Sequence, residues 1–170
     1  MPDQPARRIR LMVTGHARHG KDTLCEALRP LRFASSSLFV CSRVVYPVLG
    51  PRLGYQSISE CYADRGNHRP EWKRLIWEYN AQDPARLSRE IFVESDIYCG
   101  IRDIREFRAA RSEGLFDLAI WVDAGFRHPP EPESSITITP EDCDLVVLNT
   151  TTRAALVARA RRLLQSWGLV

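Results

Sequence analysis

Gly15, Gly20 and Lys21 are spaced near the start of the chain in a way that suits anion binding. An apolar run, 9–13, precedes them and a helix-like pattern, 24–28, follows them. Glycines let successive backbone N–H groups curl around an anion, and the start of a helix adds its positive end. Lys21 would then bring a point charge to the β- and γ-phosphates of a nucleotide. The spacing predicts a phosphate-binding loop, and a plain glycine-rich turn is the alternative.

The loop departs from the usual G-x-x-x-x-G-K-[ST] pattern at one position. Asp22 stands where a serine or threonine would hold magnesium, and Thr23 comes one residue later. Asp22 is therefore the first candidate for the magnesium-anchoring acid. Asp123 follows a predicted strand and is the second candidate, although a loop cap explains it equally well. The predicted ligands of the donor phosphates are Gly15, His16, Ala17, Arg18, His19, Gly20, Lys21, Asp22 and Thr23.

Arginines in the middle of the chain could form a second anion site. An enzyme that moves a phosphoryl group to a small acceptor must hold the acceptor's own phosphate and exclude water. Arg43, Arg65 and Arg69 are suitable ligands, because a guanidinium group binds phosphate oxygens in pairs. Arg127 follows the fourth predicted strand and could neutralise charge on the transferred group. The aromatic residues that could stack on a base are Phe39, Tyr46, Tyr62 and Trp72.

Some of these residues also fit plain structural roles. Trp72 lies on an apolar stripe with helical spacing, which is more typical of a core residue than of a base platform. Arg43 could be a solvated helix residue. Arg102 could form a helical pair with Glu106, four residues further on. These alternatives stay open at the level of the sequence.

Histidines and cysteines do not form a recognisable metal site. The five cysteines are widely spaced and include no C-x-x-C pair, which argues against a zinc site or a disulfide framework and for a reducing compartment. His68 and His128 have no evident partner. Inside the loop, His16 and His19 are expected to contribute their backbone and not their side chains.

The composition fits a single domain with a sizeable core. The chain has 170 residues, of which 44% are hydrophobic and 26% charged. A net charge of +3 does not suggest a general nucleic-acid binder. No apolar segment reaches membrane length or resembles a signal, so a cytoplasmic protein is expected, with a short disordered lead over residues 1–7. Lys21 stands out, because Lys73 is the only other lysine among 24 basic residues.

Apolar runs predict the elements that position the candidate residues. The expected strands are Ile9–Thr14, Leu31–Ala34, Asp96–Cys99, Phe116–Val122 and Asp144–Leu148. Helical patterns separate these strands, which indicates an α/β fold with a central parallel five-stranded sheet and helices on both faces. Ligands on such sheets bind at the carboxyl ends of the strands.

Two longer connections complete the single predicted domain. Residues 35–93 are expected to form a helical acceptor-binding region, whose first long helix ends before Pro47. Residues 125–140 are rich in proline, and Glu131 and Glu133 are expected to keep them solvated. We expect this segment to be a short mobile lid that excludes water during transfer. A fixed surface loop is the alternative.

Several stretches resemble phage-type deoxynucleoside monophosphate kinases. His19–Leu24 resembles the family's G-K-D-T-L loop, and Tyr98–Glu106 resembles its strand-end pattern of an arginine followed by a glutamate four residues later. Arg127 matches the arginine after the next strand, and Asp144–Asn149 resembles the last strand with its asparagine. The similarity covers most of the chain in order and spacing, and only the loop is individually specific. Gly100 departs from the family, in which related proteins often carry aspartate.

The resemblance implies a three-layer P-loop kinase fold and an ATP- and Mg²⁺-dependent transfer to a (deoxy)nucleoside monophosphate. We expect Lys21, Arg102 and Arg127 to act in catalysis, and Asn149 and Thr150 to lie near the donor base. The acceptor-binding candidates are Ser36, Ser37, Arg43, Arg65, Arg69, Trp72, Arg102 and Glu106. Small nucleotides are the expected partners, without nucleic acid or membrane, and a homodimer is one expectation. The alternatives are a kinase for another phosphorylated small molecule, of the phosphomevalonate or dephospho-coenzyme A type, and a non-catalytic nucleotide-binding module.

Overall fold

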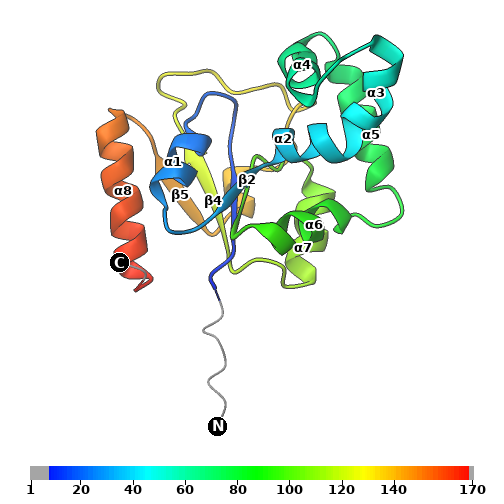
Figure 1. Ribbon diagram of the computed structural model, residues 1–170. Helices are drawn as coiled ribbons and strands as arrows, with labels where there is room; N and C mark the ends of the chain where they lie inside the picture. The colour runs from blue at the N-terminus through cyan, green and yellow to red at the C-terminus, as the bar shows by residue number, and fades with distance from the viewer. Residues whose placement is uncertain (1–7, 169–170) are drawn as a thin grey trace.

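The structure, a computed structural model, describes residues 8–168, so the expected disordered lead over 1–7 lies outside the described residues. Within 8–168 the centre is a sheet of five parallel strands in the order β2-β3-β1-β4-β5 (Figure 1). The strands are β1 Leu11–Thr14, β2 Phe33–Ser35, β3 Ile97–Cys99, β4 Leu118–Asp123 and β5 Leu145–Leu148. Both β1 and β3 are buried along their whole length, as their continuous apolar runs predict for central parallel strands.

Helices cover both faces of this sheet (Figure 1). The covering helices are α1 Lys21–Ala27, α6 Arg86–Glu94, α7 Ile104–Ser112 and α8 Arg153–Ser166. On one face, Leu24 of α1 and Leu156 of α8 pack with the apolar side chains of the strands. On the other face, Ile91 of α6 and Phe107 of α7 pack in a second cluster around Met12. The predicted three-layer α/β fold with a parallel sheet is therefore confirmed.

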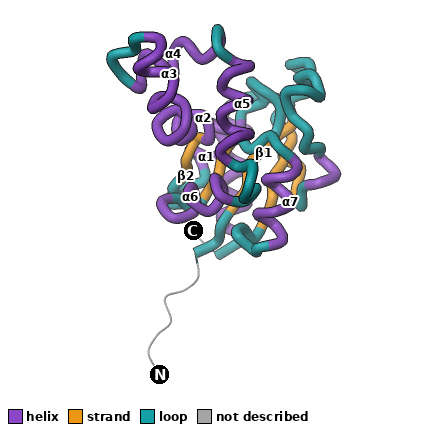
Figure 2. Tube along the Cα trace, turned by 90° about the vertical axis from the view of Figure 1, so that its right-hand side faces the viewer, coloured by secondary structure: helices purple, strands orange, loops and turns teal. Residues whose placement is uncertain are grey.

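The connection between β2 and β3 is helical, as expected. It contains α2 Ser36–Val40, a π-helix Cys41–Val45, α3 Tyr46–Leu53, α4 Ile58–Ala63 and α5 Arg69–Tyr79. Figures 1 and 2 agree that α3, α4 and α5 lie toward the carboxyl ends of the strands. The predicted helix end before Pro47 is wrong, because the chain stays helical to Leu53. Pro47 is the second residue of the segment that follows the π-helix, where a missing N–H is tolerated.

Side-chain caps fix the start of two helices that follow strands. The Asp103 carboxylate accepts a hydrogen bond from the Arg105 N–H at 2.9 Å, and this cap begins α7 directly after Arg102. The Thr152 hydroxyl accepts from the Ala155 N–H at 3.2 Å and begins α8. The first cap holds the position of Arg102 beside the end of β3.

The connection between β4 and β5 runs without a helix until the short turn Pro140–Asp142. Its later part is anchored, because Ile136 and Ile138 are buried in the core. The Thr137 N–H also donates to the carbonyl oxygen of Arg102 at 3.0 Å. Its earlier part, 125–135, lies over the glycine-bounded loop through contacts described below.

The cysteines agree with the expectation that the chain has no disulfide framework. All five cysteines are free thiols, and four of them are buried. No helix within residues 8–168 is long and apolar enough to cross a membrane.

Candidate functional site

The loop between β1 and α1 has a backbone that its glycines permit. Gly15 has a φ of 136° and Gly20 a φ of 96°, in the region that L side chains rarely adopt. A Cβ atom on Gly15 would collide with the carbonyl oxygen of Val122 in β4. A Cβ atom on Gly20 would collide with the side-chain amide of Asn149. Glycine is therefore required at both ends for the loop to pass this close to β4 and to the end of β5.

Two cations approach the loop from different elements. Lys21 is the first residue of α1 and is only 9% exposed, and its Nζ donates to the carbonyl oxygen of His16 at 2.6 Å. Arg102 reaches the same place from the end of β3. Burial lowers the pKa of Lys21, and the charge of Arg102 lowers it further. An anion beside both cations would offset the repulsion between their charges.

The carboxylate of Glu131 lies beside these two cations and acts as the anion. One of its oxygens accepts from the backbone N–H of Ala17 at 2.6 Å and from Nη1 of Arg102 at 2.9 Å, and the other accepts from Arg102 at 3.0 Å. The expectation that Glu131 keeps its segment solvated is wrong, since the side chain is only 16% exposed. Glu133 is exposed as expected. No local signal marks Glu131, because its contact with Ala17 joins residues 114 positions apart.

The two loop histidines contribute their side chains, contrary to expectation. His19 is 1% exposed, and its Nδ1 accepts from the backbone N–H of Ala124 at 2.9 Å. A nitrogen that accepts this bond carries no proton, so Nε2 is the donor in the 3.3 Å contact with the carbonyl oxygen of His128. The Nδ1 of His16 accepts from the N–H of Glu131 at 3.1 Å. Both rings therefore tie the loop to the segment after β4.

Asn149 and Arg127 meet at the end of β5. The Asn149 amide donates to the carbonyl oxygen of His19 at 2.9 Å, which holds the loop from the β5 side. Arg127 donates to the carbonyl oxygens of Asn149 at 2.7 Å and of Thr151 at 3.1 Å. Thr150, between these two residues, is exposed. Arg127 thus contacts the region expected to bind the donor base, and its action on the transferred group stays a prediction.

Three of the acceptor-binding candidates come together beside the end of β3. The Ser36 hydroxyl donates to the carbonyl oxygen of Gly100 at 3.0 Å, and the Ser37 hydroxyl lies 3.2 Å from the hydroxyl of Tyr62. The guanidinium of Arg65 lies 4.0 Å from the centre of the Tyr62 ring. Gly100 has a φ of 98°, and a Cβ there would lie 2.9 Å from the Ser36 hydroxyl, so an aspartate would not fit without a shift. Hydroxyls, an aromatic ring and a cation therefore share one surface.

Other acceptor-binding candidates lie elsewhere. Arg43 pairs with Glu94 at 3.2 Å, and Glu94 lies just before β3, at the end of that strand opposite the loop. Trp72 is buried in the core, 6.5 Å from the ring of Tyr62, which supports the structural alternative. Arg69 begins α5 with an exposed side chain. The structure therefore places Arg43 away from the loop and Trp72 in the core, which favours the structural alternatives for both residues.

Glu106, another acceptor-binding candidate, has its carboxylate buried inside the protein. It accepts from the Ser88 hydroxyl at 2.8 Å and from the Asn80 amide at 3.1 Å. Burial raises the pKa of Glu106 to about 7, although hydrogen bonds from Ser88, Tyr98 and Asn80 act in the opposite direction. Arg102 bonds to Glu131 and not to Glu106, so the helical-pair alternative is wrong as well. Glu106 ties α7 to α6 and to the loop before it.

Glu106 should make the stability of the protein fall as the pH rises from about 4.5 to about 7. A raised pKa means that the folded state holds the proton more tightly than the unfolded chain does. The stabilisation is therefore fully present below the unfolded value and is lost as the pH passes the folded value. The loss should reach about 3 kcal/mol. Urea unfolding across this pH range should show the slope in the parent chain and a much smaller slope in Glu106→Gln.

The exposed Glu141 provides the matched control for this measurement. Glu141→Gln should keep the parent's dependence of unfolding free energy on pH. A constant difference between Glu106→Gln and the parent at every pH would contradict the prediction.

The acids proposed to hold magnesium lie near the loop but are not equally available. Asp22 is exposed in the first turn of α1, and its carboxylate accepts a hydrogen bond from the Cys99 thiol at 3.6 Å. Asp123 uses one oxygen to accept from the Gly125 N–H at 2.7 Å, which is the expected loop cap. Within residues 8–168 no cluster of three or more His, Cys, Asp or Glu side chains could hold a metal alone. A site of one carboxylate with phosphate oxygens and water would suit Mg²⁺, so the exposed Asp22 stays the first candidate for this role.

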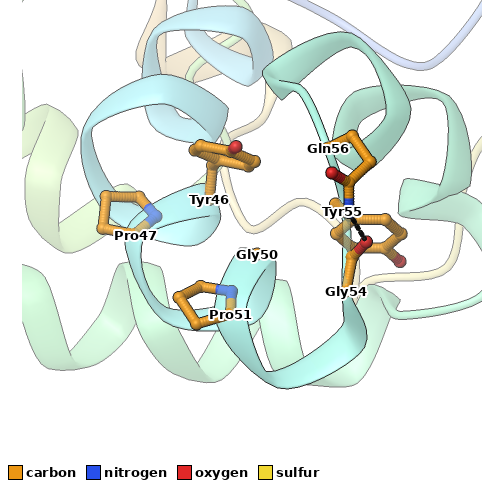
Figure 3. A pocket seen from close by; sticks show the side chains of 7 residues that line it. All are labelled: Tyr46, Pro47, Gly50, Pro51, Gly54, Tyr55 and Gln56. Atoms are coloured by element: carbon orange, nitrogen blue, oxygen red, sulfur yellow. Dashed lines mark hydrogen bonds between the residues drawn. The ribbon is translucent and has the colours of Figure 1, made fainter.

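A hollow of about 390 Å³ lies on α3 and the turn after it (Figure 3). Its lining residues are Tyr46, Pro47, Gly50, Pro51, Gly54, Tyr55 and Gln56. None of them carries a positive charge, and none belongs to the loop. The hollow therefore offers no cation to a phosphate group and is distinct from the candidate site.

Comparisons with known proteins do not assign a function to the chain. No family model matches the chain, and no curated protein matches it. Among solved structures, an unliganded sugar kinase from a Janibacter species is similar with a TM-score of 0.47 and 16% identity, over 92% of this chain and 94% of that one. At this level of similarity the functional assignment rests on the chain's own residues.

Proposed function

We propose that this chain is a P-loop kinase that transfers the γ-phosphate of ATP to the phosphate of a (deoxy)nucleoside monophosphate. The observation that carries the proposal is the anion position bounded by Lys21, Arg102 and the Ala17 N–H. A phosphoryl group in transit carries negative charge, which two fixed cations and a backbone N–H stabilise. An oxygen of the acceptor phosphate bonds to the γ-phosphorus as the bond to ADP breaks. No nucleophilic side chain is needed.

Donor and acceptor lie on opposite sides of this position in the proposal. Asn149 and Arg127 form the donor side, beside the end of β5. Tyr62 and Arg65 form the acceptor side, where the ring could stack on a base and the cation could hold its phosphate. Mg²⁺ would be held by Asp22 together with the phosphates, and its charge would help to neutralise their oxygens.

A coupled assay of ADP release tests this function. The protein should release ADP from ATP only when a suitable ribo- or deoxyribonucleoside monophosphate is present. If only phosphomevalonate or dephospho-coenzyme A supports turnover, the protein is a kinase with a different acceptor from the one proposed. ATP binding without turnover on any phosphorylated acceptor would instead indicate a nucleotide-binding module.

Replacement of Arg65 should separate acceptor binding from donor binding. Arg65→Ala removes the cation above Tyr62 and should raise the Michaelis constant for the monophosphate about ten- to hundred-fold, with little change for ATP. Arg43→Ala is the control, because Arg43 pairs with Glu94 away from the loop, and it should change neither constant. If Arg65→Ala raises the Michaelis constant for ATP more than that for the monophosphate, Arg65 belongs to the donor site and not to the acceptor site.

A further inference from the structure

The anion in the candidate site belongs to the protein itself. Glu131 is held there by its carboxylate, through Ala17 and Arg102, and by its backbone N–H, which donates to His16 at 3.1 Å. These contacts seat the carboxylate more firmly than a single surface ion pair would. The site is therefore filled by a side chain at the place where the proposed reaction needs a phosphate.

The carboxylate is charged in this position. Burial opposes its ionisation, but the charge of Arg102 and the hydrogen bond from Ala17 outweigh burial, so the pKa of Glu131 is lowered. The charge of Lys21 acts in the same direction. Glu131 therefore neutralises the two cations that a phosphate would otherwise neutralise, and a phosphate cannot bind both while the carboxylate remains.

We propose that Glu131 is a built-in substitute for a phosphate group, which closes the transfer position in the free protein and must be displaced by substrate. The proposal rests on the proposed function, because it requires Lys21 and Arg102 to be phosphate ligands. The displacing group is a terminal phosphate, supplied either by the γ-phosphate of ATP or by the acceptor monophosphate.

The segment that carries Glu131 can leave without disturbing the core. It begins after the buried Ala124 and ends before the buried Ile136. Its other contacts with the rest of the chain are polar as well. They include the His128 carbonyl with His19, the Ser134 carbonyl with Lys73 at 2.7 Å, the Ser135 carbonyl with Arg102 at 3.4 Å, and Arg127 with the carbonyl oxygens at the end of β5. Three prolines remove backbone donors from the segment. They are Pro129, Pro130 and Pro132. Movement of this segment away from the loop therefore replaces polar contacts with contacts to water and exposes little apolar surface.

Affinity measurements on matched glutamine variants test the proposal. The parent, Glu131→Gln and Glu133→Gln are titrated by calorimetry with ATP, with ADP and with a nucleoside monophosphate. Glu131→Gln keeps the size of the side chain but removes the competing charge, so it should bind the displacing ligand about ten- to hundred-fold more tightly than the parent. Glu133 is exposed in the same segment, so Glu133→Gln should bind like the parent.

The ligands identify which phosphate displaces the carboxylate. Tightening for ATP without tightening for ADP places Glu131 at the γ-phosphate, and tightening for the monophosphate places it at the acceptor phosphate. Glu131→Ala removes the carboxylate entirely and should reproduce the tightening, with thermal unfolding reported for each variant. Equal affinities in the parent and both Glu131 variants would overturn the proposal and leave the kinase function standing. Absence of ATP binding in all variants would overturn both.

Discussion

Lys21→Met should lower the turnover number for phosphoryl transfer by about a thousand-fold or more, because Lys21 is one of the two cations beside the proposed transfer position. The methionine keeps most of the length of the side chain and its apolar contacts. The folded structure should persist, since the ammonium group forms one hydrogen bond, to the carbonyl oxygen of His16. Single-turnover measurement of ADP formation reports the chemical step, and circular dichroism reports the fold.

The second lysine of the chain makes a matched control. Lys73 is exposed on α5 and donates to the carbonyl oxygen of Ser134, outside the transfer position. Lys73→Met should keep the turnover number within about three-fold of the parent, as expected for a surface contact. A folded Lys21→Met variant that turns over at the parent rate would show that the loop does not hold the transferred phosphate.

The sequence predicted the fold because the strands carry their own signal. β1 and β3 are short, continuously apolar and flanked by glycine or helix-capping residues, and burial on both faces requires such a pattern. The region around Pro47 was harder to predict, because a proline near a helix start and a proline that ends a helix have the same local sequence. The π-helix Cys41–Val45 distinguishes the two cases, because it places Pro47 at the start of α3. Its buried residues pack in the core, which the local sequence does not show.

The candidate site was predicted where local spacing determines it. Lys21 and the two loop glycines follow from a local pattern, and Arg102 was expected from the resemblance of Tyr98–Glu106 to the strand-end pattern of the kinase family. Glu131 could not be found in this way, because it reaches the loop across 114 residues from a proline-rich segment. The side chain of His19 was missed for the same reason, since its partner Ala124 lies 105 residues away. The contacts that close the site are long-range.

Arg102→Ala should lower the turnover number about hundred- to thousand-fold, because it removes the second cation from the transferred group. The Michaelis constant for ATP should change much less, since a contact made mainly in the transition state lowers the turnover number and the specificity constant together. Arg105→Ala is the control, because Arg105 is exposed in the first turn of α7, three residues after Arg102, and pairs with Asp103. It should leave both constants near the parent values.

Arg102 also holds Glu131, so the two residues should be coupled in binding whichever ligand displaces the carboxylate, ATP or the monophosphate. In the parent chain, Glu131→Gln should tighten binding of that ligand because it removes a carboxylate seated by Arg102. In an Arg102→Ala background that seat is lost, so the same substitution should tighten binding much less. Independent sites would instead give the same gain in both backgrounds. Equal gains in affinity in the two backgrounds would contradict the role of Arg102 at the transfer position. An Arg102→Ala variant that changes only the Michaelis constant for ATP would contradict it as well.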